Sequence, residues 1–254
     1  MKRLSQILPS FKFKYLLGIA FLLLSISAFS QKQVDTISQQ WIQSYHEGKI
    51  STKWTALLDG GFRWREGFSI STAYIIRGGI GYSITPSLRI AAGFANLGLY
   101  GEGKVIRYEY RPYQEIQLKT PLGKIGLSQR FRIEERFYED RSPISNFELP
   151  DFNYRFRYSV MFAIPLFQLS KNEPNRRLVL NLGNEIFWNA GKQATRVFDQ
   201  NRLILSPTLQ WNKQLSISFT YNRQFASTLK EDFYLLSNIA WLQIRHNLDF
   251  SKNQ

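Results

Sequence analysis

Apolar and polar residues alternate with a period of two in several stretches of this chain. From Phe152 to Val160 every even position is aromatic or apolar and every odd position is polar. A similar alternation runs from Leu215 to Asn222 and from Gln129 to Phe137. A helix would scatter these residues around its axis, whereas a strand places them on two faces. The pattern therefore predicts β-strands with one apolar and one charged face.

Turn-forming segments divide most of the chain into ten predicted strands. These are 51–64, 70–84, 88–100, 109–119, 125–137, 152–166, 178–189, 198–211, 214–225 and 236–250. The segment from Thr36 to His46 leaves three alternatives, namely an eleventh strand, one of a pair that completes twelve strands, or a periplasmic lead-in. Because bacterial single-chain barrels have even strand numbers, we predict an all-β, antiparallel up-and-down barrel of ten strands, with twelve as the alternative.

The connections between the predicted strands differ in length. Short ones fall at 85–87, 120–124 and 212–213, with a somewhat longer one at 168–177. Longer or more irregular ones fall between them, at 101–108, 138–151, 190–197 and 226–232. Outer-membrane barrels have short periplasmic turns and longer extracellular loops. This alternation predicts an orientation in which the last strand ends at the periplasmic side.

The chain has no stretch apolar enough for a helical span after its first thirty residues. Its longest segment without Asp, Glu, Lys or Arg there is Tyr158–Ser170, which contains Pro165, whereas a span needs about 20 apolar residues. Aromatic residues near predicted strand ends, as in membrane-barrel girdles, favour a transmembrane barrel: Trp54, Trp64, Tyr82, Tyr100, Tyr110, Tyr158, Trp188, Trp211, Tyr221 and Phe250. A soluble sandwich or lipocalin-like barrel, with its apolar faces inward, is the alternative.

The first thirty residues have the features of a secretory signal peptide. Four basic residues precede an apolar run from Tyr15 to Ile26, and the small residues Ala28 and Ser30 stand three and one positions before the expected cut. This arrangement predicts cleavage after Ser30 and export. We therefore expect a signal peptide over 1–30, a lead-in or first strand over 31–50 and a barrel over 51–254. The expected location is the outer membrane of a Gram-negative cell.

Composition excludes several functional classes. The chain of 254 residues has no Cys, so disulfides, thiolate metal sites and cysteine nucleophiles are excluded. Two His without a metal-ligand spacing give no metal site, and no cofactor is expected. The formal charge of +14 suggests nucleic acid, but the Arg residues alternate with apolar ones inside strands instead of forming a basic patch.

Several strings resemble a family of Gram-negative outer-membrane barrel proteins catalogued as a domain of unknown function. The strings are Lys53-Trp54 with Arg63, Arg111-Pro112-Tyr113-Gln114, Gln129 to Arg136, Tyr154 to Tyr158, Asn184-Glu185-Ile186-Phe187 and Phe198-Asp199-Gln200-Asn201-Arg202. The resemblance covers nearly the whole processed chain. It implies a barrel in the outer membrane and carries no activity, so it assigns no catalytic or binding residue.

The charged strand faces converge on the lumen of such a barrel. By parity we expect a polar network of Asp59, Arg63, Glu115, Arg130, Arg132, Glu134, Arg136, Arg155, Arg157, Glu185, Arg202 and Arg245. An arginine-rich ring favours anions in a pore, whereas small barrels are commonly filled by interlocking side chains. We predict a structural or narrow-conduit role with a filled lumen. The expected partners are outer-membrane lipids and the barrel-assembly machinery, not nucleic acid.

The alternative function is a lipid-modifying hydrolase, which here would depend on Ser, His and a carboxylate. The chain offers only His46 and His246. Parity points His246 towards lipid, but both histidines fall near the expected periplasmic rim, which is the wrong rim for hydrolysis in the outer leaflet. The sequence therefore favours a protein without enzymatic activity and names no catalytic residue.

Overall fold

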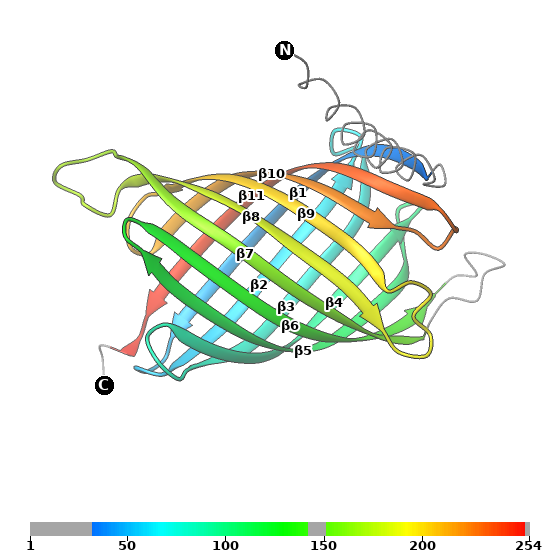
Figure 1. The fold of residues 1–254 in the computed structure, drawn as a ribbon, viewed down its shortest axis with the longest axis horizontal. Coiled ribbons are helices and arrows are strands. Elements are labelled where there is room, and N and C mark those ends of the chain that lie inside the picture. The colour runs from blue at the N-terminus through cyan, green and yellow to red at the C-terminus, as the bar shows by residue number, and fades with distance from the viewer. Residues whose placement is uncertain (1–31, 142–150, 252–254) are drawn as a thin grey trace, which may run out of the picture. The chain divides into compact units, whose positions relative to one another are not determined.

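The computed structural model describes residues 32–141 and 151–251. The predicted signal peptide lies outside the described residues. The chain divides into two units, Met1–Gln33 and Val34–Gln254, and the second is a closed β-barrel (Figure 1). Within the described residues, no helix has the length and apolar character needed to cross a membrane.

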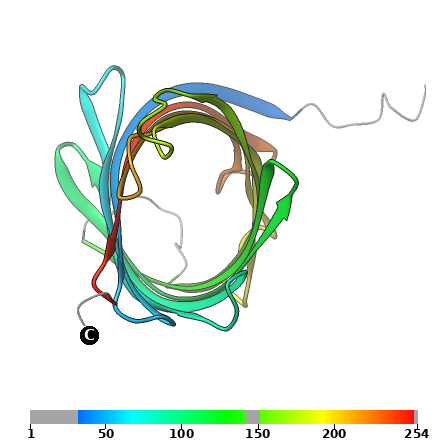
Figure 2. The same cartoon turned by 90° about the vertical axis from the view of Figure 1, so that its left-hand side faces the viewer.

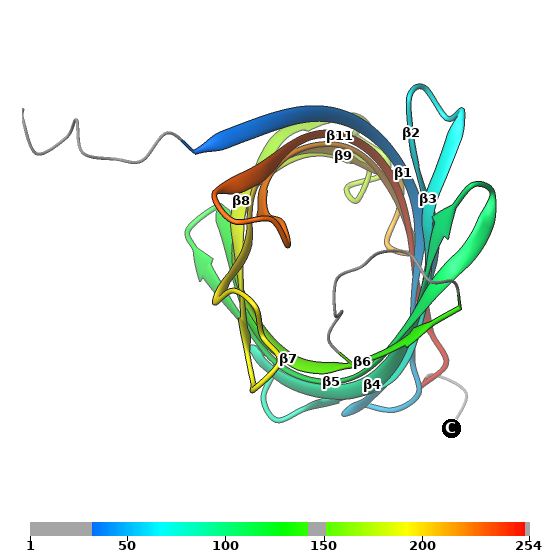
Figure 3. The ribbon, with the colours of Figure 1, turned by 90° about the vertical axis from the view of Figure 1, so that its right-hand side faces the viewer.

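Eleven strands form the barrel within residues 32–141 and 151–251. They are β1 (Gln33–Lys49), β2 (Trp54–Arg65), β3 (Ile70–Ser83), β4 (Leu88–Gly101), β5 (Lys104–Leu122), β6 (Ile125–Asp140), β7 (Phe152–Gln168), β8 (Arg177–Ala190), β9 (Phe198–Gln210), β10 (Leu215–Ser227) and β11 (Phe233–Asp249). Each strand from β2 to β11 pairs antiparallel with its sequence neighbour. Views from the two ends show one closed ring of strands (Figures 2 and 3).

The predicted strand number, ten or twelve, is wrong. The eleventh strand is β1, which contains the uncertain segment from Thr36 to His46 and pairs antiparallel with β2. It lies between β2 and β11 in the closed barrel. The prediction was wrong because it relied on the rule that bacterial single-chain barrels have even strand numbers. β1 instead adds one strand to the predicted ten.

An odd number of strands makes the closing seam parallel, because β1 and β11 run in the same direction. Contacts along the seam confirm this direction. The rings of Trp41 and Trp241 lie 5.3 Å apart, and Lys49 Nζ lies 3.7 Å from Asp249 Oδ2. The Phe250 N–H also donates to the Lys49 carbonyl at 2.9 Å. Partner numbers that rise together along both strands define a parallel register.

The ends of the strands define two rims. The first rim carries the connections at 50–53, 84–87, 123–124, 169–176 and 211–214, and the second carries those at 66–69, 102–103, 141–151, 191–197 and 228–232. The longer loop expected at 101–108 is instead a two-residue turn. Glu102 and Gly103 both have positive φ, 51° and 77°, as a type I′ hairpin turn requires. The length contrast between the rims is therefore weaker than predicted.

Polar residues occupy the interior and apolar residues the outside. Among the described side chains, 22 polar or charged residues are buried against ten hydrophobic ones. Large apolar side chains on the outer face are strongly exposed, such as Phe62 (54%), Leu203 (58%) and Phe219 (62%). A soluble barrel would direct its apolar faces inward. The structure has the opposite distribution, so it lacks the apolar core of the lipocalin-like alternative.

Two paired glycines let an aromatic ring lie flat against the inner wall. Gly79 on β3 pairs with Gly93 on β4, and Gly93 pairs with Tyr113 on β5. A Cβ on either glycine would lie 2.5 Å from the Tyr113 hydroxyl. The Arg132 guanidinium stacks over the same ring at 4.4 Å. The glycines therefore make room for an inner layer of side chains.

Candidate functional site: the charged barrel interior

The structure places the twelve predicted network residues on the inward face of seven strands. Ten of them line the central cavity, and Glu134 and Arg136 bond to other inward side chains. They come from β2, β5, β6, β7, β8, β9 and β11. Alternation along each strand brings these residues to the same side, but the contacts among them depend on the register between strands.

Glu134 on β6 is the most enclosed carboxylate of the network, with 2% of its surface exposed. It accepts hydrogen bonds from Arg155 Nε and Nη2 at 2.8 and 2.5 Å and from Arg157 Nη1 at 2.7 Å. Arg132 Nη1 lies 3.7 Å away. Arg132 and Arg157 face each other directly across β6 and β7. Like charges in that position repel, so Glu134 offsets their repulsion.

Glu185 on β8 connects four strands. It accepts hydrogen bonds from Arg157 at 2.7 Å and from Arg130 at 2.6 Å, and Arg202 Nη1 lies at 3.5 Å. Arg130 reaches Glu185 over Ser159, since the three residues occupy one row of the sheet. A larger residue than Ser159 would block that path. The small side chain thus allows an ion pair between strands that are not neighbours.

Further ion pairs surround this centre. Arg132 donates to Glu115 at 2.6 Å, and Arg77 donates to Asp59 at 2.7 Å. Glu109 and Arg111, which the predicted network omitted, form another group, in which Arg111 and Arg136 both donate to Glu109. Arg89 on β4 and Glu47 on β1, also outside the predicted network, pair at 3.0 Å. Glu109 and Arg111 share the parity of Glu115, but the expected loop at 101–108 placed them at a rim.

Aromatic rings connect opposite sides of the lumen. The Arg202 guanidinium on β9 lies 4.6 Å from the Phe187 ring and 5.4 Å from the Trp41 ring on β1. The Arg63 guanidinium on β2 also stacks on the Trp41 ring, at 4.2 Å. Trp41 and Phe187 are 4% and 1% exposed. Sequence analysis missed both as lumen residues, although each has inward parity.

Hydroxyl and amide side chains cover the inner wall of β9, β10 and β11. Ser206 Oγ lies 2.6 Å from Thr220 Oγ1, and Thr208 Oγ1 lies 2.7 Å from Ser218 Oγ. Gln243 donates to Thr220 at 2.8 Å. These small side chains leave space that the arginines opposite do not fill. A cavity of about 780 Å³ remains in the interior.

This arrangement can hold or exclude charged solutes, but it contains no recognisable catalytic centre. No cluster of three or more metal-ligating side chains occurs within the described residues. The model of one protein family, described as "Protein of unknown function (DUF2490)", matches residues 38–234. The chain belongs to this family. No curated protein and no solved structure matches it.

The DUF2490 match runs from residue 38, within β1, to the beginning of β11. The matched region therefore includes the entire Glu134 and Glu185 network. Since the family has no established function, it assigns no role to these residues. Two surfaces of this DUF2490 member bear on its function, namely the charged interior and the apolar outer face.

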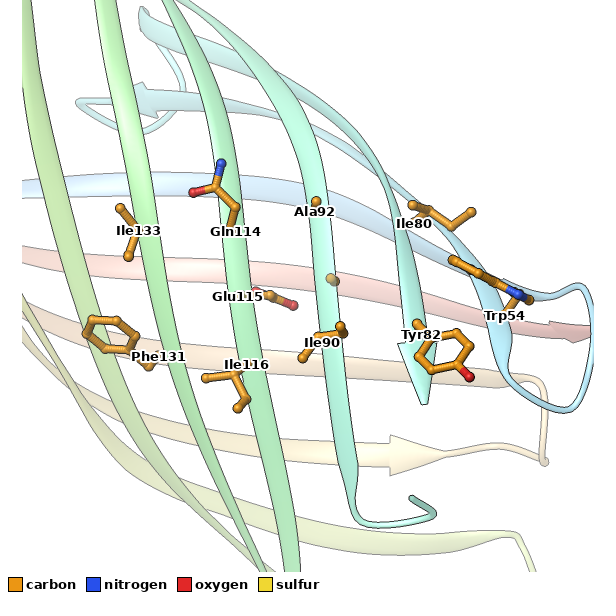
Figure 4. Close-up of a pocket in the computed structure, with 11 residues that line it drawn as sticks. Trp54, Ile80, Tyr82, Ile90, Ala92, Gln114, Glu115, Ile116, Phe131 and Ile133 are labelled. Atoms are coloured by element: carbon orange, nitrogen blue, oxygen red, sulfur yellow. The ribbon is translucent and has the colours of Figure 1, made fainter. Parts of the chain in front are cut away.

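The outer face has a shallow apolar depression over β2 to β6, about 760 Å³ in volume. Ile80, Ala92, Gln114 and Ile133 lie in one row across four strands. Ala92 and Gln114 occupy the middle of the depression, with Trp54 and Tyr82 at one side (Figure 4). Gln114 places an outward amide among the apolar side chains that line this depression.

The two histidines meet at the parallel seam. The rings of His46 and His246 stack with centroids 5.1 Å apart and an interplanar angle of 9°. Ser44 Oγ lies 2.9 Å from His46 Nε2. His246 Nδ1 is buried without a hydrogen-bond partner. Within the described part of the chain no carboxylate bonds either ring.

Proposed function

We propose that this protein is an integral β-barrel of a Gram-negative outer membrane, with a narrow interior held by the Arg/Glu network. The observation that carries the proposal is the inverted distribution of polarity, with a charged interior inside an exposed apolar wall. Water would penalise such a wall, whereas hydrocarbon would not. A closed barrel also satisfies its strand backbones without an open edge, as lipid requires.

Hydrogen bonds among outward-facing amides support a lipid environment. Asn184 and Asn201 donate to each other at 3.0 Å, and Asn96 accepts from Tyr74 at 2.7 Å. Other outward amides are bonded in the same way: Gln129 to Tyr158, Asn238 to Tyr221, and Gln40 to the Phe68 N–H. An amide exposed to water needs no such partner, whereas an amide in hydrocarbon does.

Aromatic clusters near the two rims support the same assignment. Trp54 and Tyr82 contact each other near the first rim, with ring centroids 4.8 Å apart. Trp64 and Phe68 lie 5.4 Å apart near the second rim. Membrane barrels place aromatic girdles at both interfaces. By the alternation of turn lengths, we assign the first rim to the periplasm.

The remaining assignments follow from this location. The basic and apolar first thirty residues support export with cleavage after Ser30. The partners are then outer-membrane lipids and the machinery that assembles barrels there. The cargo, if any, is a solute small enough for a lumen narrowed by side chains. We favour a closed or narrow conduit over an open channel because Arg202 bridges Trp41 and Phe187 inside it.

Membrane insertion is the first test. The processed protein should fold into phospholipid vesicles, resist urea extraction and migrate faster on gels before boiling than after it. Purification as a folded monomer without detergent would overturn the proposal. In planar bilayers the folded barrel should give small or no current steps. Large, stable steps in the wild type would contradict the narrow lumen while leaving the membrane assignment intact.

A variant that removes the aromatic bridge sharpens the conductance test. Trp41→Ala should increase the frequency or size of current steps, since it removes the ring that Arg63 and Arg202 contact. Phe219→Ala is the matched control, because this aromatic residue lies on the outer face with 62% exposure. Equal currents in both variants would show that Trp41 does not narrow the conduit.

A lipid hydrolase is the second candidate, favoured by the 2.9 Å contact between Ser44 and His46 on the outward face. A serine nucleophile also requires a group that orients its base. The ring of His246 stacks on His46 but offers no carboxylate. Hydrolysis of phospholipid that is abolished by both Ser44→Ala and His46→Ala would establish this activity, and unchanged lipid in wild-type vesicles would exclude it.

A further inference from the structure

The interior cavity carries a large excess of positive charge. Among the described residues, twelve cationic side chains and four carboxylates line it. Glu109, Glu134 and Asp199 approach the same arginines from outside the cavity lining, but they do not balance the difference. Charges enclosed in a region of low dielectric constant need counterions close by. The side chains of the protein therefore leave a net positive charge in the cavity, which an anion from solution can balance.

The imbalance is concentrated on the side of the barrel near the parallel seam. Arg63 lines the cavity and forms no ion pair or hydrogen bond with another described residue, and its guanidinium lies flat over Trp41 at 4.2 Å. Arg245 is similar, since it lies 4.1 Å over the Tyr45 ring and bonds only the neutral Gln243, at 3.0 Å. Both guanidinium groups keep free N–H donors towards the cavity.

The aromatic residues beneath these arginines form one group. Trp241 contacts Trp41 at 5.3 Å and Tyr45 at 6.5 Å. The Trp241 Nε1–H is buried without an acceptor. Arg63, Arg245 and Trp241 thus bring hydrogen-bond donors to the same wall, and no carboxylate serves any of them within residues 32–141 and 151–251. Two carboxylates of the cavity lining lie on this side, and both have partners: Asp59 is bonded by Arg77 and Gln43, and Glu47 by Arg89.

We propose that this wall binds small oxyanions, of the phosphate or carboxylate class, at the Arg63 guanidinium over Trp41 and at the Arg245 guanidinium over Tyr45. The inference rests on the proposed outer-membrane barrel and adds the chemical class of solute that its interior accepts. A planar guanidinium presents parallel N–H donors that match two oxygens of a phosphate or carboxylate. Stacking on Trp41 and Tyr45 fixes the plane of each guanidinium before the anion arrives.

The geometry distinguishes an oxyanion from a simple halide. A spherical ion gains from the positive potential but not from the two-pronged arrangement of each guanidinium. The cavity volume of about 780 Å³ leaves room for a hydrated phosphate or a small phosphate ester. We therefore expect the interior to select anions over cations and to prefer oxyanions over chloride at the same ionic strength.

The test measures thermal unfolding of the folded barrel in a phosphate-free detergent. Inorganic phosphate should raise the apparent Tm by about 5 °C over chloride at equal ionic strength. Acetate and glycerol 3-phosphate, added in separate arms, distinguish a carboxylate from a phosphate ester as the better ligand. Arg63→Gln and Arg245→Gln should each remove at least half of the phosphate-dependent shift. Arg63→Lys, which keeps the charge and loses the planar donors, should also reduce it.

Arg176→Gln is the matched control, because Arg176 also stacks on an aromatic ring, 4.2 Å over Trp211, and lacks a carboxylate partner among the described residues, but lies at the first rim outside the cavity lining. It should keep the full shift. An equal phosphate shift in the wild type and in both Arg→Gln variants would overturn the site, as would its absence from the wild type. Faster migration of unboiled protein on gels, with or without phosphate, reports membrane-barrel folding separately, so failure of the anion site leaves the proposed function standing.

Discussion

His46 and His246 stack nearly parallel, with ring centroids 5.1 Å apart, at the junction of the first and last strands. Their residue numbers differ by 200, and so do those of two other contacting pairs, Trp41 with Trp241 and Lys49 with Asp249. Such a constant offset belongs to a parallel pair of strands. It fixes an odd strand number for the barrel, and it can be tested directly.

The parallel seam predicts which cysteine pairs can be cross-linked. The chain has no native Cys, so a double variant His46→Cys/His246→Cys should form one disulfide under mild oxidation. The measurement is a gel shift that is reversed by reductant. Ile42→Cys/His246→Cys is the control, because four residues along a strand move the thiol by about 13 Å. Cross-linking of the control in preference to the histidine pair would refute the register.

Loss of the central carboxylate should strongly destabilise the barrel. Glu134→Gln removes the charge that Arg155 and Arg157 share, so two buried cations lose their compensation at a cost of about 3–5 kcal/mol. The free energy of unfolding from urea titration in vesicles measures the effect. Glu66→Gln is the control, since its pair with Arg65 is exposed and contributes less than about 1 kcal/mol.

The outer face should respond to polarity as a lipid-facing surface does. Gln114→Leu removes an outward amide that bonds no other described residue, and we expect it to stabilise the barrel in vesicles. Asn184→Leu should destabilise it by about 1 kcal/mol or more, because Asn201 loses its partner. Urea unfolding of both variants gives the comparison. A loss of stability in Gln114→Leu as large as that in Asn184→Leu would contradict this assignment.

The glycine wall under Tyr113 should tolerate no added methyl group. A Cβ on Gly93 would lie 2.3 Å from the Gly78 carbonyl oxygen, so Gly93→Ala should cost about 1–3 kcal/mol. Gly78→Ala is the matched control, because no atom lies within 4 Å of its Cβ position. Thermal unfolding of the two variants tests the difference. Equal stability of the two variants would contradict the close approach of β3 and Tyr113 to Gly93.

Local alternation along the chain accounts for most of the strand boundaries. The strand predicted over 125–137 is β6, Ile125–Asp140, and that predicted over 152–166 is β7, Phe152–Gln168. The same alternation assigned Arg130 and Glu185 to one face. These features depend on residues near each other in sequence, because a strand turns each successive side chain to the opposite face.

Contacts between distant residues required the tertiary structure. Parity places Arg130 and Glu185 on the same face, but only the register of β6, β7 and β8 aligns them with Ser159 between. The parallel seam depends likewise on the pairing of β1 with β11, whose residues are about 200 positions apart. Sequence alternation thus determined the faces of the strands. Barrel closure decided the strand number and which charges pair, because both depend on register between strands and not on order along the chain.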